Sequence, residues 1–528
     1  MAYKFDIDTT PPVPALPITK DKTKIDVRYA VISPYTTVHI YWDSKNSELK
    51  YEVEEPVLTQ DEKKLLDKLE NAMVEMINVN VVVEKTQEAV LGYLDKTARL
   101  LIDELNLSLS ESSYNKIFYY LYRDFVGLNE TDPLINDYFI EDIECNGLNS
   151  PVYIVHRIYR NIRTNINFDS IDKLASFVEK LAQRCGRYIS YASPILDGSL
   201  PDGSRVNATY TTDISSKGPT FTIRKFTTLP WTPVQLVSFN TLSPEMLAYF
   251  WLLIQYKSNI LIAGGTSSGK TTLLNAVSFF IPPEARVVSI EDTRELNIPR
   301  ENWLPSVARS AIGIGTVGEV DLFKLLKNSF RQNPDYVIVG EVRGQEAFVL
   351  FQGMASGHSS LSTMHADSVD TVIKRLETPP IELSPTLINT LDAVAIMSHS
   401  IVKKEHTRRL SSIVEIINVS PEGIAITNTP FIWNPADDKF YFKKDSKVFD
   451  KIKRRYGLTD EQIQAEFTIR TKLIYEMYKK KIFDFNEIQM IVNEYYKNPE
   501  AIIQKFNLLP PPAPQKEHQR TYPTGLRY

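Results

Sequence analysis

The residues best suited to chemistry lie at 264–272, where the sequence reads GGTSSGKTT. This segment fits the pattern G-x-x-x-x-G-K-[ST], with Gly264, Gly269, Lys270 and Thr271 at the fixed positions. Glycines let successive backbone N–H groups point at phosphate oxygens, the lysine neutralises phosphate charge, and the threonine hydroxyl ligates Mg²⁺ directly. The pattern predicts a binding loop for ATP and Mg²⁺, completed by Gly265, Thr266, Ser267, Ser268 and Thr272.

Two acidic positions further along the chain are candidates for catalysis. Glu291, with Asp292 beside it, follows the apolar run RVVSI, and Glu341 follows DYVIV and Gly340. Ligands gather at the carboxyl ends of strands in a parallel α/β sheet. Hydrolysis of a phosphate chain needs one group to deprotonate water and a carboxylate shell for Mg²⁺. A single acid at a strand end is more often a helix cap, but two such acids after a phosphate loop favour catalysis.

The elements around these residues alternate between strand and helix patterns. Short strands are predicted at 259–263, 286–290, 336–339, 361–364 and 393–397, with helical patterns between them. This order predicts an α/β fold, a mostly parallel sheet with helices on both faces. We divide the chain into a flexible arm (1–25), a strand and helix domain (26–130), an α+β domain (131–229), a linker (230–240), an ATPase core (241–445) and a helical region with a Pro-rich tail (446–528).

Within the N-terminal part, strands are predicted at 29–41 and 49–53, and a helical pattern covers roughly 85–126. Thr59 and Glu62 form a capping box, so a helix is expected to begin there.

Composition excludes several classes of protein. The chain has 43% hydrophobic and 24% charged residues, which is typical of globular proteins, and its net charge of −5 argues against nucleic acid as the main partner. Its two cysteines, Cys145 and Cys185, build neither a disulfide framework nor a four-cysteine zinc site. The longest apolar run, 246–254, is far shorter than the roughly 20 residues that span a bilayer. A cytoplasmic protein that contacts the membrane only through partners is therefore expected.

Four sequence boxes resemble those of the secretion ATPase superfamily, which powers type II and type IV secretion, type IV pili and archaella. They are GGTSSGKTT, then SIEDTREL (289–296), NPDYVIVGEVRG (333–344) and GHSSLSTMHADS (357–368). The resemblance implies a RecA-like P-loop NTPase core preceded by α+β N-terminal domains. It further implies that Glu291 is the general base, that Glu341 supports Mg²⁺ through water, and that His365 lies near the γ-phosphate. His358 and His365 remain open to two other readings, as metal ligands or as structural polar residues.

The segments PILDGSLPDGSRVNATY (194–210) and GPTFTIRKF (218–226) resemble the second N-terminal domain of the same superfamily. The matching positions, Arg205 and Arg224, are implied to reach the nucleotide, and Arg343 is a further candidate. Each of these arginines is also open to the plainer reading of a surface salt bridge.

The form EDTREL and the N-terminal pattern at 29–62 resemble archaeal members, above all the archaellum motor and assembly ATPase. This implies a homohexameric ring at the inner face of the cell membrane, working with a polytopic membrane platform protein and other archaellum or pilus motor components. An archaeal type IV adhesive pilus or a related secretion system is the alternative. A RecA-like DNA motor and a nucleotide switch without turnover belong to different classes and are less favoured by the acidic residues and the net charge.

Overall fold

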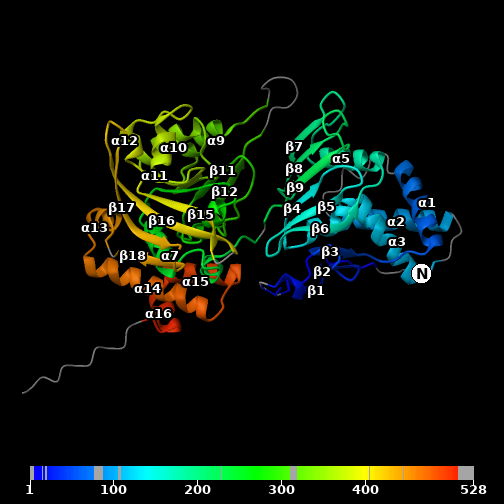
Figure 1. Ribbon diagram of the computed structural model, residues 1–528, viewed down its shortest axis with the longest axis horizontal. Helices are drawn as coiled ribbons and strands as arrows, with labels where there is room; N and C mark the ends of the chain where they lie inside the picture. Colours follow the sequence, from blue (N-terminus) through cyan, green and yellow to red (C-terminus); the bar gives the residue numbers. More distant parts are fainter. Residues whose placement is uncertain are drawn as a thin grey trace, which may run out of the picture. The chain divides into compact units, whose positions relative to one another are not determined.

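The computed structural model describes residues 5–14, 16, 17, 19, 21–76, 87–104, 109–227, 229–309, 318–402, 405–443 and 445–508. Contacts divide the chain into two compact units, Met1–Phe226 and Thr227–Tyr528, and each is built around a nine-stranded sheet (Figure 1). The Pro-rich tail predicted from the sequence lies outside the described residues. So does the start of the helical pattern predicted over 85–126.

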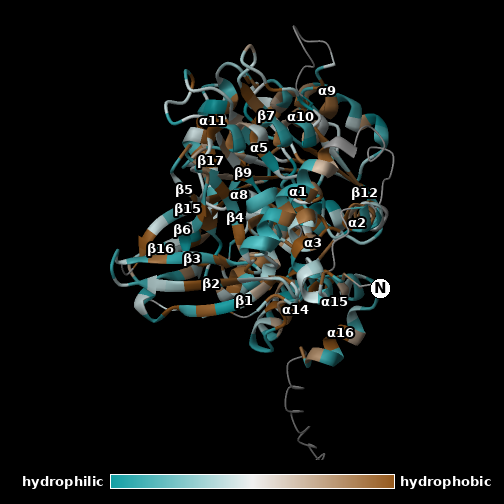
Figure 2. Ribbon diagram, turned by 90° about the vertical axis from the view of Figure 1, so that its right-hand side faces the viewer, coloured by the Kyte–Doolittle hydropathy of each residue, from teal (hydrophilic) through white to brown (hydrophobic). Residues whose placement is uncertain are grey.

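The N-terminal unit has a sheet in the order β1-β2-β3-β6-β5-β4-β9-β8-β7. All neighbouring strands are antiparallel except β3 and β6, which are parallel. Buried and more accessible residues alternate along β3, β5 and β8, as expected where one face of a sheet is covered. Figure 2 shows hydrophobic and hydrophilic residues mixed along β1, β2 and β3. The strands are β1 (Asp26–Ile32), β2 (Thr36–Asp43), β3 (Glu48–Glu54), β4 (Ile140–Cys145), β5 (Pro151–His156), β6 (Arg160–Asn167), β7 (Ile195–Ser199), β8 (Arg205–Thr209) and β9 (Thr220–Arg224).

Helices cover part of this sheet and also pack on one another. α5 contacts β8 and β9, whereas α1, α2 and α3 contact each other around a separate apolar cluster. α1 begins at the predicted capping box, where Thr59 N–H donates to Glu62 Oε2 and Glu62 N–H donates to Thr59 Oγ1. The helices are α1 (Gln60–Met76), α2 (Gln87–Glu104), α3 (Glu111–Phe125), α4 (Asp132–Asn136) and α5 (Ile171–Arg184).

The N-terminal unit differs from the sequence expectations in three ways. The single strand expected over 29–41 is two strands, β1 and β2, separated at residues 33–35, because Pro34 has no N–H for a continuous ladder. The boundary expected at residue 130 falls inside one unit, since β3 pairs with β6. Residues 1–25 were expected to form a mobile arm, yet Phe5 packs edge-on against Phe118 with ring centroids 4.6 Å apart.

The C-terminal unit has a sheet in the order β12-β11-β13-β14-β10-β15-β16-β17-β18. Strands from β12 to β15 are parallel, and β15 to β18 form antiparallel pairs. The mostly parallel α/β core predicted from the sequence is thus confirmed, with an antiparallel extension. The strands are β10 (Ile260–Gly264), β11 (Val287–Glu291), β12 (Trp303–Val307), β13 (Tyr336–Val339), β14 (Ser359–Met364), β15 (Ala393–Val402), β16 (Glu405–Val419), β17 (Ala425–Asn434) and β18 (Lys439–Phe442).

Helices lie on both faces of this second sheet, as the strand pattern predicts. Successive residues of β10 enter different cores: Ile260 and Ile262 belong to one apolar cluster, Leu261 and Ala263 to the other. Residues of α9–α12 build the second cluster, and these helices lie above the sheet in Figure 1. They are α9 (Leu322–Ser329), α10 (Glu346–Ala355), α11 (Val369–Glu377) and α12 (Pro385–Ile388).

The opposite face of the sheet carries helices from both ends of the unit. α7 and α8 pack there with α13–α16 in one apolar cluster, so residues after 446 belong to the same unit as the core. α6 lies within the segment expected to be a linker, and it begins at a capping box formed by Thr232 and Gln235. These helices are α6 (Pro233–Ser238), α7 (Pro244–Gln255), α8 (Lys270–Ser278), α13 (Lys447–Tyr456), α14 (Asp460–Lys479), α15 (Phe485–Lys497) and α16 (Pro499–Phe506).

A buried carboxylate ties the C-terminal helices to the sheet. Glu415 on β16 is 0% exposed, and it accepts hydrogen bonds from Tyr249 Oη at 2.7 Å, Asn428 Nδ2 at 2.8 Å and the Lys447 backbone N–H at 2.8 Å. The hydroxyl of Ser446, the N-cap of α13, also donates to it. One side chain therefore joins α7, β16, β17 and the start of α13.

Replacing Glu415 with alanine should lower the free energy of unfolding of the C-terminal unit by about 3 kcal/mol. The change leaves several buried donors without an acceptor, and their lost hydrogen bonds are charge-assisted. Chemical denaturation followed by circular dichroism measures this. Glu422→Ala, which removes an exposed acid from the turn between β16 and β17, is the control and should leave the transition in place. Equal midpoints for the two variants would contradict the assigned role of Glu415.

Candidate active site

The loop between β10 and α8 is tightly wound. Gly269 is the N-cap of α8 with φ of 96°, in the left-handed region that favours glycine. A Cβ on Gly264 would lie 2.5 Å from Ser268 Oγ and 2.6 Å from the carbonyl oxygen of Met397, so a larger residue does not fit. At Gly265 the equivalent position is open. The loop therefore forms a cradle at the N-terminal end of α8, the arrangement that binds phosphate.

Lys270 lies inside this cradle and connects it to the histidine box. Its side chain is 8% exposed. Its Nζ donates to the Gly265 carbonyl at 3.0 Å and lies 3.3 Å from His365 Nδ1. Burial lowers the pKa of Lys270, and the charges of Glu341 and Glu295 act in the opposite direction. A cation held at this depth is placed to meet the phosphates of a nucleotide, while Thr271 and Thr272 lie in the first turn of α8.

Glu291 ends β11 and is 2% exposed. Its Oε1 accepts hydrogen bonds from the backbone N–H groups of Glu295 and Leu296, each at 2.9 Å. Its Oε2 is buried and has no hydrogen-bond partner among the residues that the structure describes. Burial raises the pKa of Glu291 to about 7, although the two backbone hydrogen bonds act to lower it. A carboxylate with this pKa and one uncommitted oxygen is suited to accept a proton from water.

Glu341 and His365 follow two strands that lie side by side. β13 and β14 pair in parallel, so the residues after them meet at the same edge of the sheet. His365 Nε2 lies 3.4 Å from Glu341 Oε1, and Thr363 Oγ1 donates to the Gly340 carbonyl at 2.7 Å. Together with the contact between Lys270 and His365, this brings three of the four predicted boxes together.

The structure separates the two histidines that were considered as a metal pair. His358 precedes β14 and lies edge-on to Phe330, with ring centroids 4.9 Å apart, whereas His365 follows the other end of that strand. Within the described ranges, the structure holds no group of three or more His, Cys, Asp or Glu side chains arranged to bind a metal ion. His358 and His365 therefore lie at opposite ends of β14, an arrangement that favours the reading of His358 as a structural polar residue.

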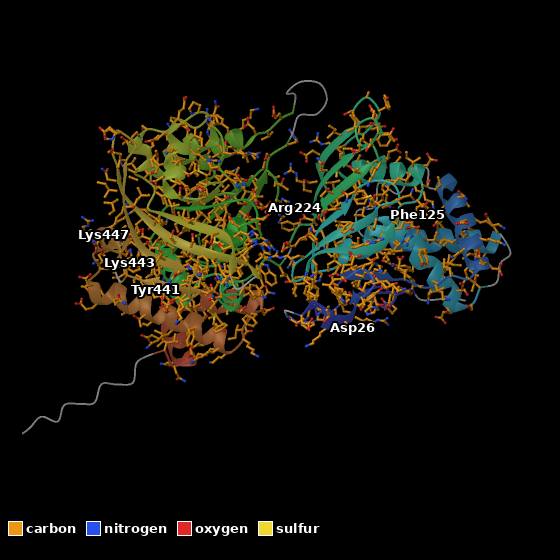
Figure 3. All side chains as sticks on the ribbon, viewed as in Figure 1. Asp26, Phe125, Arg224, Tyr441, Lys443 and Lys447 are labelled. Carbon is orange, nitrogen blue, oxygen red and sulfur yellow. The ribbon has the colours of Figure 1, made fainter. Side chains whose placement is uncertain are left out.

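The arginines predicted to contact phosphate have acidic partners in the structure. Arg343 forms an ion pair with Asp292. Arg205 and Arg224 are paired across β8 and β9 in the N-terminal unit, and Arg224 is labelled in Figure 3. Their ion pairs are Arg205 with Asp197 at 3.0 Å and Arg224 with Asp142 at 3.1 Å. Because the phosphate loop belongs to the C-terminal unit, a contact of these arginines with nucleotide stays a prediction.

Several residues that hold the site were missed by sequence reasoning. Asn275 on α8 accepts from the Asn297 N–H at 2.9 Å and donates to the Glu295 carbonyl at 3.2 Å. Arg300 donates to the carbonyl of Phe279 at 2.9 Å. The partners in these hydrogen bonds are main-chain groups, which every residue has. The bonds therefore leave no pattern of residue types in the sequence. The apolar run RVVSI followed by an acid identified Glu291 as a candidate. No sequence signal identified Asn275 or Arg300.

The raised pKa of Glu291 predicts how stability depends on pH. Because the folded pKa of about 7 exceeds the ordinary value, the protonated carboxyl contributes stability that is complete below the unfolded pKa and is lost as pH rises toward 7. Between about pH 5 and pH 8 the nucleotide-free protein should therefore lose about 2 kcal/mol relative to Glu291→Gln. Denaturant titrations of both proteins at the two pH values check this. If the difference in unfolding free energy between wild type and Glu291→Gln is the same at both pH values, Glu291 titrates in its ordinary range.

Comparisons with known proteins show which family the chain resembles. Residues 132–428 match the family model described as "Type II/IV secretion system protein". The chain is 35% identical over 489 residues to an uncharacterized protein of Methanocaldococcus jannaschii, covering 87% of each chain. It is 35% identical over 230 residues to the type IV secretion system protein PtlH of Bordetella pertussis, covering 39% of this chain and 67% of that one. The solved structure of the Legionella pneumophila ATPase DotB is 15% identical, with a TM-score of 0.37, and the match covers 68% of this chain and 92% of that one.

The family match covers more than half of the chain and contains all four boxes, from the phosphate loop to His365. The long relative extends the similarity through both units of the structure. The chain therefore belongs to the type II/IV secretion system protein family, the secretion ATPases.

Proposed function

We propose that the protein is a Mg²⁺-dependent ATPase that converts ATP and water to ADP and phosphate. The observation that carries this proposal is the buried, uncommitted Oε2 of Glu291 at the end of β11, in the sheet whose central strand leads into the phosphate loop. A nucleotide switch without turnover has no need for a carboxylate whose pKa lies near 7.

The residues of the loop divide the work of binding and chemistry. Backbone N–H groups at the start of α8 would hold the phosphates, with Lys270 Nζ exchanging its Gly265 carbonyl for a phosphate oxygen. Thr271 would ligate Mg²⁺ directly and Glu341 would do so through water. The ion, when bound, neutralises charge on the phosphate oxygens. The tight cradle at Gly264 and Gly269 fits such a complex. Glu291 would take the proton of the attacking water, and His365 would contact the γ-phosphate.

ATP turnover by the purified protein tests the proposal directly. Phosphate release should require Mg²⁺ and be unchanged by single-stranded DNA, since the net charge of −5 argues against nucleic acid as the main partner. Strong stimulation by DNA would favour the motor class instead. Binding without any turnover would favour a switch.

Arg205 and Arg224 are proposed to contact the phosphates and to make the active protein a homohexameric ring. Both arginine side chains are exposed, and of their acidic partners Asp197 is exposed and Asp142 is partly exposed, so the arginines can exchange these partners for phosphate. When an arginine of one unit binds a phosphate that is held by another unit, cleavage of that phosphate removes the contact. Hydrolysis is thereby coupled to movement of the two units. Sedimentation at micromolar protein with a non-hydrolysable ATP analogue should give a hexamer, and a monomer at saturating analogue would contradict the ring.

The process served is proposed to be assembly of an archaellum through a polytopic membrane platform protein, with its rotation left as an open second process. Its supports are the long archaeal relative and the archaeal form of the EDTREL box. No helix among the described residues is long and apolar enough to cross a membrane. We place the protein in the cytoplasm, at the inner face of the membrane. Electron microscopy of a deletion strain should show loss of archaella. Loss of adhesive pili with archaella intact would favour the alternative.

A further inference from the structure

The loop that follows Glu291 is held against α8 along its length. Its first part supplies the two N–H donors, Glu295 and Leu296, that orient Glu291. Asn275, on α8, binds the carbonyl of Glu295 and the N–H of Asn297. The position of the Glu291 carboxylate thus depends on how firmly the segment between residues 292 and 300 is fixed.

Arg300 fixes the C-terminal end of the segment between residues 292 and 300. Its Nη2 donates to the carbonyls of Phe279, at 2.9 Å, and Ile281, and its Nη1 donates to the carbonyl of Pro299 at 3.2 Å. The carbonyls at the C-terminal end of a helix lack partners within the helix, and a cation there also interacts favourably with the helix dipole. Burial lowers the pKa of Arg300 to about 10, so the group stays positively charged at neutral pH.

The same arginine also contacts the C-terminal helices. Its Nη1 donates to Asn493 Oδ1 on α15 at 2.7 Å. Beside it, Tyr496 Oη of α15 donates to the carbonyl of Phe280 at 2.6 Å. One guanidinium therefore joins the loop that orients Glu291, the end of the helix that carries the phosphate loop, and α15.

We propose that Arg300 is a positioning residue for Glu291 and that, through Asn493, the C-terminal helices set the geometry of the catalytic carboxylate. The inference rests on the proposed ATPase activity. Without Arg300 the loop is released at its far end, and the N–H donors of Glu295 and Leu296 move away from Oε1. The carboxylate then loses both its orientation and the hydrogen bonds that favour its charged form.

Arg300→Met should lower kcat for ATP by roughly 10- to 100-fold, because small displacements of a catalytic group are costly. The dissociation constant of a fluorescent ATP analogue should change by less than about threefold, since the phosphate loop keeps its own contacts. The pH at which kcat is half-maximal should move upward. Glu415→Ala is the control, because it destabilises the same unit without contacting this loop. Both variants are assayed well below their unfolding temperatures.

Asn493→Ala tests the contact with α15 alone, because Arg300 keeps its bonds to α8. It should lower kcat by about two- to tenfold, and an unchanged kcat would overturn the role of the C-terminal helices.

Hydrogen exchange separates this inference from the proposed function. In the nucleotide-free protein, the amides of Glu295 and Leu296 should exchange faster in Arg300→Met than in wild type or in Glu415→Ala. Equal exchange, kcat and pH dependence in Arg300→Met and the control would overturn the positioning role. Equal phosphate release by wild type and Lys270→Ala would defeat the ATPase proposal, and the exchange experiment would still decide the role of Arg300.

Discussion

Replacing Glu291 with glutamine should lower ATP turnover by roughly 10²- to 10⁴-fold and leave nucleotide binding nearly intact. Glutamine keeps the size of the side chain and an oxygen that accepts from the N–H groups of Glu295 and Leu296. What it lacks is the ability to take a proton from water. The loop geometry is expected to persist, so the loss falls on kcat and not on affinity.

Steady-state phosphate release and binding of a fluorescent ATP analogue measure the two effects separately. Glu301→Gln is the matched control, since it neutralises an exposed acid ten positions along the chain, beyond the contacts that orient Glu291. The control should keep turnover within about threefold. Near-normal turnover in Glu291→Gln would mean that Glu341 or another acid is the base.

Replacing Lys270 with alanine should weaken ATP binding by about 100-fold or more, which corresponds to about 3 kcal/mol. The ammonium lies in the cradle, bonded to the Gly265 carbonyl and close to His365, and it is the buried cation of the loop. Its removal takes away a charge-assisted bond that nearby backbone N–H groups do not replace. ATP turnover should fall together with the affinity for ATP in Lys270→Ala. In Glu291→Gln, by contrast, turnover should fall while the affinity stays nearly the same.

Titration with the fluorescent analogue gives the dissociation constant for Lys270→Ala. Lys327→Ala, which removes an exposed lysine from the last turn of α9, is the control and should bind like wild type. Wild-type affinity in Lys270→Ala would show that the loop does not hold the phosphates in the proposed way.

Much of the core could be predicted from the sequence because its strands are buried on both faces and read as short apolar runs. The strand predicted at 336–339 coincides with β13, and those at 259–263 and 286–290 are offset by one residue from β10 and β11. The pairing of β3 with β6 was not predictable, because it joins segments more than a hundred residues apart and leaves no local signal. Burial of α13–α16 against α7 was missed for the same reason.

For the site, the fixed spacing of the phosphate loop and the acids after two strands identified the reacting groups. The structure brings Glu341 and His365 to 3.4 Å from each other, whereas the roles predicted for them at Mg²⁺ and at the γ-phosphate stay predictions. Asn275, Arg300 and Asn493 could not be predicted, because their partners are main-chain groups or residues far away in the sequence. Residues that react or bind phosphate can be found in a sequence by their type and spacing. The residues that orient them cannot, because their contacts are formed only in the tertiary structure.

The Met397 carbonyl that lies against Gly264 belongs to a strand far downstream of the phosphate loop in the sequence. β10 pairs with β14 and β15, both encoded more than ninety residues downstream, so a nascent chain carries the loop sequence long before it carries the walls of the loop. Such long-range pairing forms late and exposes apolar strands in the meantime. During synthesis the phosphate loop therefore stays unfinished until residue 397 has left the ribosome, and shorter nascent chains have no complete nucleotide cradle.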